Sequence, residues 1–387
     1  MTMKYRAALC ALGLAGLAAT VPAAAQEVVK IGFSGPLSGG AAQYGKNTLD
    51  GLKFAVDELN AENFQVGGKK VTFEVVALDD KYNPSETAIN FQRLVQQSKT
   101  PVVMCPHSGG GFAIQTSNER LKALLLSYTS VPKITAMGNK LTMRIPPDFS
   151  AYVKPFVAYQ MKRYGKNLAI AGADHEYAKE WTALVKQAWE AAGGKIVADN
   201  PMSYNRSTDF YSGVSKALAA KPDVLFIGGA SEPTGLVAKQ ARDLGFKGGF
   251  IVMDQAKLNE MKHVVGSYAA LDGAVGVLPV IEDTNPNVKA WTARWMQKYP
   301  GREPGSEASL NYTAMRVTAL AMQLAGTATD AVAIRAKLPE AIKKLPAAQN
   351  LANYDAIDAN GGTSGDIRVA VVEGGKIKEV KLGELGK

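Results

Sequence analysis

The chain is poor in cysteine and histidine, with two and three residues of these types among 387. No pair of them has the spacing of a metal-ligand motif. The chain also lacks a G-x-S-x-G nucleophile elbow, a Walker A sequence and a G-x-G-x-x-G fingerprint. Together these absences disfavour a metalloenzyme, a serine hydrolase and a nucleotide-binding enzyme, and no cofactor is expected.

Blocks of like charge and long apolar runs are absent from the body of the chain. The Lys and Arg residues that give a net charge of +9 are scattered and build no basic stripe, so no nucleic-acid partner is expected. No stretch after the first 25 residues is apolar enough to cross a bilayer. We therefore expect a soluble mature protein.

The first 25 residues have the three parts of a cleavable export signal. Lys4 and Arg6 supply positive charge, an apolar stretch rich in Ala and Leu covers 7–21, and small residues follow Pro22. This order predicts cleavage after Ala25 and a periplasmic location. Cys10 is disfavoured as a lipoprotein anchor because it precedes most of the apolar stretch.

The mature chain would contain 387 − 25 = 362 residues, which is enough for about two domains. Its single cysteine, Cys105, lies in an apolar run, so we expect a buried thiol and no internal disulfide.

Short β-rich runs alternate with longer helical patterns, first along 28–128 and again along 168–253. Such alternation predicts parallel sheets with helices on both faces, and two blocks of it predict two α/β lobes. Proline-containing breaks at 143–149 and 278–287 look like crossovers between the lobes, and Gly374-Gly375 predicts a hairpin near the end. The expected strands cover 28–33, 71–78, 101–105, 124–128, 168–171, 195–200, 224–227 and 250–253, and the expected helices cover 48–60, 85–97, 112–121, 178–192, 210–219, 232–244, 288–299 and 308–324.

Polar residues follow several of these strands. In open parallel sheets, ligands bind beyond the carboxyl ends of the strands, so these residues are the candidate site. Ser108 in a Gly-rich segment that opens a helix suits a carboxylate, and Asp254 could accept an ammonium group. The candidate ligand-binding residues are Tyr44, Ser108, Gly109, Thr129, Ser130, Tyr177, Ala230, Ser231 and Asp254.

Taken singly, each candidate has an ordinary structural explanation. Ser108 could cap a tight strand–helix turn, Asp254 could cap a turn, and the tyrosines could pack at a rim. Asp79-Asp80, followed by Asn83-Pro84, is interpreted as a turn and helix cap. Their common place after strand ends favours one shared site.

The motifs of the chain resemble the periplasmic substrate-binding proteins of branched-chain amino acid (Leu/Ile/Val-type) ABC transporters. The similarity covers essentially the whole mature chain. The motifs that carry it are Pro36-Leu37-Ser38-Gly39, Ala42-Gln43-Tyr44-Gly45, Asp57-Glu58-Leu59-Asn60-Ala61, Asp79-Asp80, Pro146-Pro147-Asp148, Thr208-Asp209-Phe210, Pro222-Asp223-Val224 and Gln240-Ala241-Arg242-Asp243-Leu244-Gly245.

This resemblance implies a type I periplasmic binding protein, with two doubly wound parallel-sheet α/β lobes joined by a three-strand hinge. Lobe one would comprise 27–146 plus 278–355, and lobe two 147–277 plus 356–387. The lobes would close on a small amino acid or related carboxylate, and the closed protein, a monomer, would dock on a membrane permease.

Matched position by position, Ser108 corresponds to a carboxylate-binding serine and Asp254 to the acid that holds the ammonium. Tyr44 and Tyr177 match a tyrosine in each lobe, and Thr129 a contact to the polar end of the ligand. Ala230 stands where leucine-type members carry an aromatic, and Val131 falls near an expected threonine.

These departures leave the ligand open. Relatives with this architecture are similar to binders of aromatic acids, amides and urea. A ligand sensor that feeds a chemoreceptor is a second alternative, and a hydrolase that uses Ser108 and His175 is a third and weaker one, because no orienting third group accompanies the pair.

Overall fold

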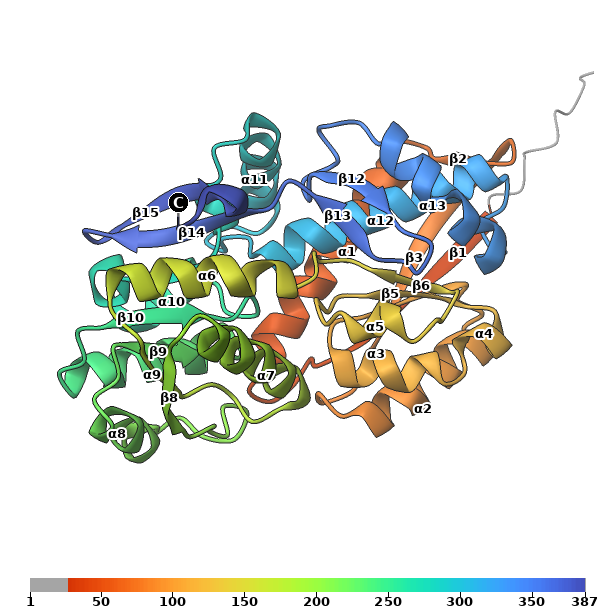
Figure 1. The fold of residues 1–387 in the computed structure, drawn as a ribbon. Coiled ribbons are helices and arrows are strands. Elements are labelled where there is room, and N and C mark those ends of the chain that lie inside the picture. The colour runs from red at the N-terminus through yellow and green to blue at the C-terminus, as the bar shows by residue number, and fades with distance from the viewer. Residues whose placement is uncertain (1–26, 387) are drawn as a thin grey trace, which may run out of the picture.

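The computed structural model describes residues 27–386. The expected export signal, 1–25, lies outside the described residues. Two large sheets form the centres of two lobes, which Figure 1 shows side by side. Each is a predominantly parallel sheet with helices on both faces, which confirms the predicted α/β fold class.

The first sheet has the strand order β2-β3-β1-β4-β5-β6. β1 lies between β3 and β4, pairs with both in parallel, and is almost continuously buried over its second half because helices cover both of its faces. β2 alone is antiparallel to its neighbour. The strands are β1 (Glu27–Gly35), β2 (Gln65–Val66), β3 (Lys69–Asp79), β4 (Val102–Cys105), β5 (Leu124–Ser127) and β6 (Thr142–Arg144).

Helices from two distant parts of the chain cover this first sheet. The large core on one face includes buried side chains of α1, α11, α12 and α13, whereas α2 and α3 contribute to a smaller core on the other face. The helices of this lobe are α1 (Ala42–Ala61), α2 (Pro84–Gln96), α3 (Ser108–Gln115), α4 (Asn118–Leu121), α5 (Lys133–Ala136), α11 (Pro286–Lys298), α12 (Ser306–Ala325) and α13 (Ala331–Lys344).

The second sheet has the order β15-β14-β11-β10-β9-β7-β8. The predicted C-terminal hairpin is confirmed, since β14 and β15 pair antiparallel around Gly374-Gly375 and join the edge of this sheet (Figure 1). Its strands are β7 (Asn167–Ile170), β8 (Lys195–Asp199), β9 (Val224–Ile227), β10 (Gly249–Val252), β11 (Ala274–Val277), β14 (Arg368–Glu373) and β15 (Lys376–Lys381).

A single large core holds this second lobe together, with buried tryptophans at Trp181 and Trp189. The helices of the lobe are α6 (Ser150–Arg163), α7 (Glu176–Ala191), α8 (Tyr211–Ala219), α9 (Ser231–Asp243) and α10 (Leu258–Val265), and its short 3-10 turns are η1 (Tyr268–Leu271) and η3 (Leu382–Glu384). A third turn, η2 (Val280–Glu282), contributes Val280 to the core of the first lobe. No helix within 27–386 is long and apolar enough to cross a membrane.

The chain passes between the two sheets three times: after β6, after β11 and before β14. Before the last passage, β12 (Tyr354–Ile357) and β13 (Thr363–Gly365) form a small ribbon of their own. Arg144 N–H donates to the Gly361 carbonyl and the Thr363 hydroxyl to the Ile145 carbonyl, so the ribbon packs beside the first sheet. A lobe division after Gly365 fits these hydrogen bonds better than one at 355.

Two predicted helices differ clearly from the structure. The helix expected over 48–60 begins six residues earlier, as α1 from Ala42. The expected helix over 112–121 is instead two short helices, α3 and α4. α3 begins four residues earlier than expected because its glycines allow close packing: a Cβ on Gly110 would lie 2.7 Å from the Cys105 sulfur, and one on Gly111 2.9 Å from the Ser127 hydroxyl. The glycine run therefore belongs to the helix and lets it approach β4 and β5.

Candidate ligand-binding site

A small cavity lies where loops of the two lobes meet. Six of the nine candidate residues line it: Tyr44, Ser108, Thr129, Ser130, Tyr177 and Asp254. The other lining residues are Tyr82, Pro106, His107, Tyr128, Pro146 and Gln255. The strand-end argument therefore brings most of the candidate residues to one place, whereas their part in binding stays a prediction.

Asp254 is the carboxylate of this cavity. Its Oδ2 accepts a hydrogen bond from the Ser130 hydroxyl at 2.5 Å, and its Oδ1 accepts from the Tyr177 hydroxyl and, at 3.2 Å, from the Trp181 indole N–H. Burial raises the pKa of Asp254, although these hydrogen bonds oppose the increase. The carboxylate is thus poised for a positively charged partner that would offset its desolvation.

These direct hydrogen bonds also explain why the cavity is small. Ser130 belongs to the first lobe and Tyr177 and Asp254 to the second, so their contacts draw the lobes together. The remaining space is about 30 Å³, which accommodates one or two water molecules. A larger ligand must therefore separate these side chains, and its own polar groups must replace their hydrogen bonds.

The N-terminus of α3 presents Ser108 to the same cavity. The first N–H groups of a helix have no intrahelical acceptor and form the positive end of its dipole. The His107 ring caps one of them, because its Nδ1 accepts from Gly110 N–H at 3.0 Å. Ser108 is 3 % exposed, and its hydroxyl makes no hydrogen bond to another residue of the described chain.

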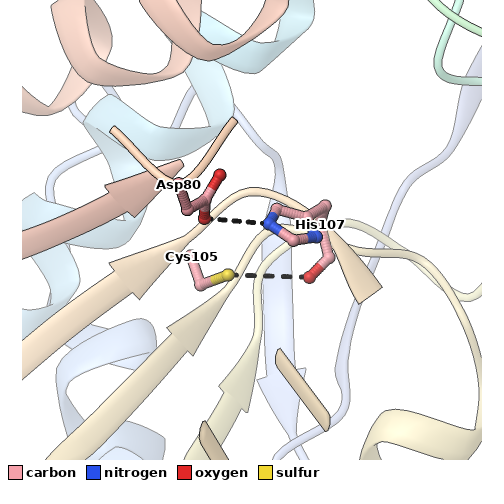
Figure 2. Close-up of side chains that lie close together, drawn as sticks. All are labelled: Asp80, Cys105 and His107. Carbon is pink, nitrogen blue, oxygen red and sulfur yellow. Dashed lines mark hydrogen bonds and ion pairs between the residues drawn. The ribbon is translucent and has the colours of Figure 1, made fainter. Parts of the chain in front are cut away.

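A buried network holds the His107 ring in this position, and Figure 2 shows its contact with Asp80. With Nδ1 accepting, the neutral ring carries its proton on Nε2, which lies 2.9 Å from Asp80 Oδ2. The same carboxylate oxygen accepts from the hydroxyls of Ser34 and Thr87. Asp80 thereby fixes the tautomer and orientation of the ring that caps α3.

Asp80, Cys105 and His107 also place potential metal-ligand atoms within 4.8 Å of one another (Figure 2). Each has a partner of its own, since the Cys105 thiol donates to the His107 carbonyl at 3.6 Å. Burial raises the pKa of this thiol well above its usual value, so the protonated form, a poor ligand, is favoured. The three side chains are therefore explained by a structural role: Asp80 holds the His107 ring, and this ring caps the N-terminus of α3.

Aromatic rings form the walls of the cavity. The Tyr44 hydroxyl donates to the Pro106 carbonyl at 2.5 Å, and its ring lies 6.0 Å from that of Tyr128. Tyr82 stacks on His107 with 4.7 Å between ring centroids. Burial raises the pKa of the cavity's tyrosines, so their hydroxyls stay protonated.

Three candidate residues lie outside this cavity. A Cβ on Gly109 would lie 2.8 Å from the Pro84 ring, so this residue packs against the start of α2. Ala230 and Ser231 begin α9 and line a second, larger cavity of about 450 Å³. Tyr44 lines both cavities and is therefore their shared wall.

The geometry gives no support to a hydrolase. His175 Nδ1 accepts from Ala178 N–H at 3.2 Å and so caps α7, and burial lowers the pKa of His175 to about 4. Within 27–386 no hydrogen bond joins its ring to Ser108. A general base must reach the hydroxyl it activates.

Several residues of the cavity are not among the nine candidates. His107 and Gln255 belong to the strand-end pattern, since they follow predicted strands beside Ser108 and Asp254, whereas Tyr128 ends the strand predicted over 124–128. Tyr82 had no such signal. It lies in the turn between β3 and α2, where Asn83 caps α2 as predicted, and reaches the site because the turn points toward the other lobe, where Gln255 Nε2 donates to its hydroxyl at 3.3 Å.

Comparisons with known proteins agree with this architecture. Residues 28–376 match the family model described as periplasmic binding protein. A leucine-, isoleucine-, valine-, threonine- and alanine-binding protein of Pseudomonas aeruginosa is 26% identical over 333 residues, covering 84% of this chain and 86% of the relative. A Leu/Ile/Val-binding protein of Rhizobium johnstonii is 26% identical over 342 residues, or 88% of this chain and 89% of the relative.

Two solved structures have the same fold. The branched-chain amino acid transporter substrate-binding protein LivJ of Streptococcus pneumoniae, in complex with isoleucine, has a TM-score of 0.78 at 23% identity, covering 92% of this chain and 100% of its own. A solute-binding protein of an R. palustris ABC transporter, in complex with benzoate, has a TM-score of 0.77 at 17% identity, with 92% and 96% covered. The family match over most of its length shows that this chain belongs to the periplasmic binding proteins, which are binding proteins and not enzymes.

Proposed function

We propose that this protein is the periplasmic solute-binding component of an ABC importer and binds a small amino acid or related carboxylate between its lobes. It would act as a monomer and deliver the ligand to a membrane permease. The nine candidate residues, with the lining residues found in the structure, would form the binding region.

The observation that carries the proposal is the pairing of two opposite polar groups in one interlobe cavity. Asp254 supplies a buried carboxylate at one part, and Ser108 with the free N–H groups of α3 supplies donors at another. A zwitterion complements both, with its ammonium on Asp254 and its carboxylate on α3. Relatives named as binders of leucine, isoleucine and valine give independent support.

Calorimetry on the purified mature chain tests the proposal. Each of the proteinogenic amino acids would be titrated separately, and melting would be followed at matched ligand concentrations. The true ligand should raise the melting temperature, because at a concentration of 100 Kd it adds about 2.7 kcal/mol to the free energy of unfolding. Absence of heat and of stabilisation with every amino acid would overturn amino acid binding.

An aromatic carboxylate is a second candidate ligand. The observation that favours it is the four tyrosines and one histidine that wall the cavity, because flat rings pack well against such walls. The benzoate complex of a protein with the same fold makes the class worth testing. Benzoate and its hydroxylated derivatives therefore belong in the same titration, and binding of these alone would identify this second function.

A further inference from the structure

The second cavity differs from the first in size and in charge. Its volume is about 450 Å³, and it is lined from both lobes by the starts of α1 and α9, by α10, and by the segment between α11 and α12. Small residues, Gly40, Ala230 and Gly301, help to leave this space open. Because Tyr44 lines both cavities, a ligand held at Asp254 and Ser108 has this space as its direct extension.

Hydrogen-bond acceptors dominate this second cavity. Glu232, Glu260 and Glu303 line it, in a chain whose overall net charge is +9. Of the two basic lining residues, Arg302 is engaged by Asp50 at 2.8 Å, and the exposed His263 ring lies 3.5 Å from Glu303. The carboxylates therefore outnumber the cations available to pair with them.

An unpartnered buried acceptor belongs to a residue in the wall of the same cavity. Asn259 lines the cavity and is 1 % exposed, and its Nδ2 donates to Glu303 at 3.0 Å. Its Oδ1 is buried and has no hydrogen-bond partner among the described residues. This assignment of the amide is fixed by the donated hydrogen bond, since the reverse orientation would set two oxygens against each other. A buried acceptor without a donor costs free energy that a donor on a ligand would recover.

Glu260 lies beside Asn259 on α10 and completes the acceptor set. One of its oxygens accepts from Asn47 Nδ2 at 2.8 Å across the lobes. Burial, and then the nearby carboxylate of Glu307, raise the pKa of Glu260 to about 7. Lys257 and the hydrogen bonds from Ser231 and Asn47 oppose this increase in pKa without cancelling it, so a bound cation would further stabilise the charged form.

We propose that the second cavity is a subsite for the positively charged end of an extended ligand, an alkylammonium or guanidinium group whose N–H donors bind Glu260, Glu303 and the Oδ1 of Asn259. The proposal rests on the proposed amino acid function for the other end of that ligand. A space of about 450 Å³ exceeds the cage of a single metal ion, which favours an organic cation.

Lysine and norleucine form a matched pair for the test, because they share a four-carbon side chain and differ in the terminal ammonium. Calorimetry on the wild type should show lysine binding about ten- to a hundredfold more tightly, the range expected for charge-assisted hydrogen bonds. Glu260→Gln should remove most of this preference, because it should lower lysine affinity much more than norleucine affinity. Glu74→Gln, at an exposed position of β3, is the control for loss of one negative charge.

A second variant tests the space itself. Ala230→Phe should fill part of the cavity and abolish the preference for lysine. Alanine, which has no tail, should lose less affinity than lysine, and the melting temperature shows whether the variant folds. Equal affinity for lysine and norleucine in the wild type would overturn the subsite, as would an equal effect of Glu260→Gln on both. Calcium chloride in place of lysine tests a metal, and stabilisation by calcium that is lost in Glu260→Gln would also overturn the proposal.

Failure of the subsite and failure of the amino acid function remain distinguishable. If alanine and norleucine bind but lysine has no advantage, the subsite is wrong and the main function stands. If no amino acid binds, 1,5-diaminopentane, which lacks the α-carboxylate, tests the subsite alone. Its binding should then be lost in Glu260→Gln and kept in Glu74→Gln, and a diamine that does not bind would overturn the subsite.

Discussion

At the scale of single residues, Asp254 separates the two candidate ligand classes. It accepts hydrogen bonds from Ser130, Tyr177 and Trp181, and burial raises its pKa. An amino acid would place an ammonium group against this carboxylate, whereas an aromatic acid has no such group. The charge of Asp254 therefore matters for one class only.

We predict that Asp254→Asn weakens amino acid binding by about ten- to a hundredfold, the loss expected for a charge-assisted hydrogen bond. Affinity for an aromatic acid should stay the same or increase, because one negative charge is removed. Titration of both ligand classes into wild type and variant measures this difference. Unchanged amino acid affinity would remove the ammonium-binding role from Asp254.

The direction in which Asp254→Asn changes the free energy of unfolding can also be predicted. A carboxyl whose pKa is raised in the folded state destabilises that state at pH values above its ordinary pKa, because ionisation is easier in the unfolded chain. The neutral amide side chain that Asp254→Asn introduces would lack this effect. The variant should therefore melt no lower than wild type at pH 7, which makes the affinity change interpretable.

At the scale of elements, the N-terminus of α3 depends on its cap. His107 accepts from Gly110 N–H and is itself held by Asp80, whereas α2 has an ordinary cap, in which Asn83 Oδ1 accepts from Ser85 N–H at 2.8 Å. Both caps stabilise a helix of the first lobe. Only His107 also lines the cavity.

We predict that His107→Ala lowers both stability and carboxylate affinity, whereas Asn83→Ala lowers stability alone. Asn83→Ala should cost about 1 kcal/mol, a typical value for a lost cap. His107→Ala should cost about 1–3 kcal/mol, since it leaves the buried Asp80 carboxylate without one donor. Denaturant melts and titrations on both variants test this. Equal affinity in the two variants would show that the ring does not position the α3 site.

The order of the elements was predictable because α/β lobes repeat one simple pattern. The runs expected as strands from Val28 and from Val71 lie within β1 and β3, because both runs are rich in β-branched and aromatic residues and end at turn residues. The start of α3 was not predictable, because glycine signals a turn. Here Gly110 and Gly111 serve close packing of a helix on two strands, and only the tertiary structure creates that need.

The residues of the candidate site show the same division: some could be predicted from the sequence, and others depend on the tertiary structure. Ser108, Thr129 and Asp254 were found because strand ends of parallel sheets converge on one edge. Ala230 and Ser231 follow a strand end as well, but the α9 start lies on the far side of Tyr44, in the second cavity. Such a separation depends on how two lobes meet, which no pattern within one lobe records.

At the scale of the whole molecule, polar contacts between side chains hold the lobes together. Ser130 bonds to Tyr177 and Asp254, Gln255 to Tyr82, Asn47 to Glu260, and Asn259 to Glu303, and in each case the partners belong to different lobes. Three chain passages allow the lobes to move relative to each other, so closure depends on such contacts.

We predict that Ser130→Ala shifts the ligand-free protein toward an open form, because it removes two of these contacts at once. Small-angle scattering should show a larger radius of gyration for the variant than for wild type. A saturating ligand should return both to the same compact value, and the variant should need more ligand to reach it. More ligand is needed because a ligand can shift the equilibrium between the open and closed forms only by the difference in its affinity for them, and the variant starts further toward the open form.

Ser38→Ala is the matched control for this measurement, since the Ser38 hydroxyl donates to Asp79 within the first lobe. It should leave the scattering curve unchanged. If Ser130→Ala scatters like wild type without ligand and closes at the same ligand concentration, the Ser130 contacts do not set the closing equilibrium. The remaining interlobe pairs, Gln255 with Tyr82, Asn47 with Glu260 and Asn259 with Glu303, would then carry closure. Of these residues, Asn259, Glu260 and Glu303 line the second cavity. Closure would in that case depend in part on the side chains of the proposed cation subsite, so a cation bound there would affect closure as well.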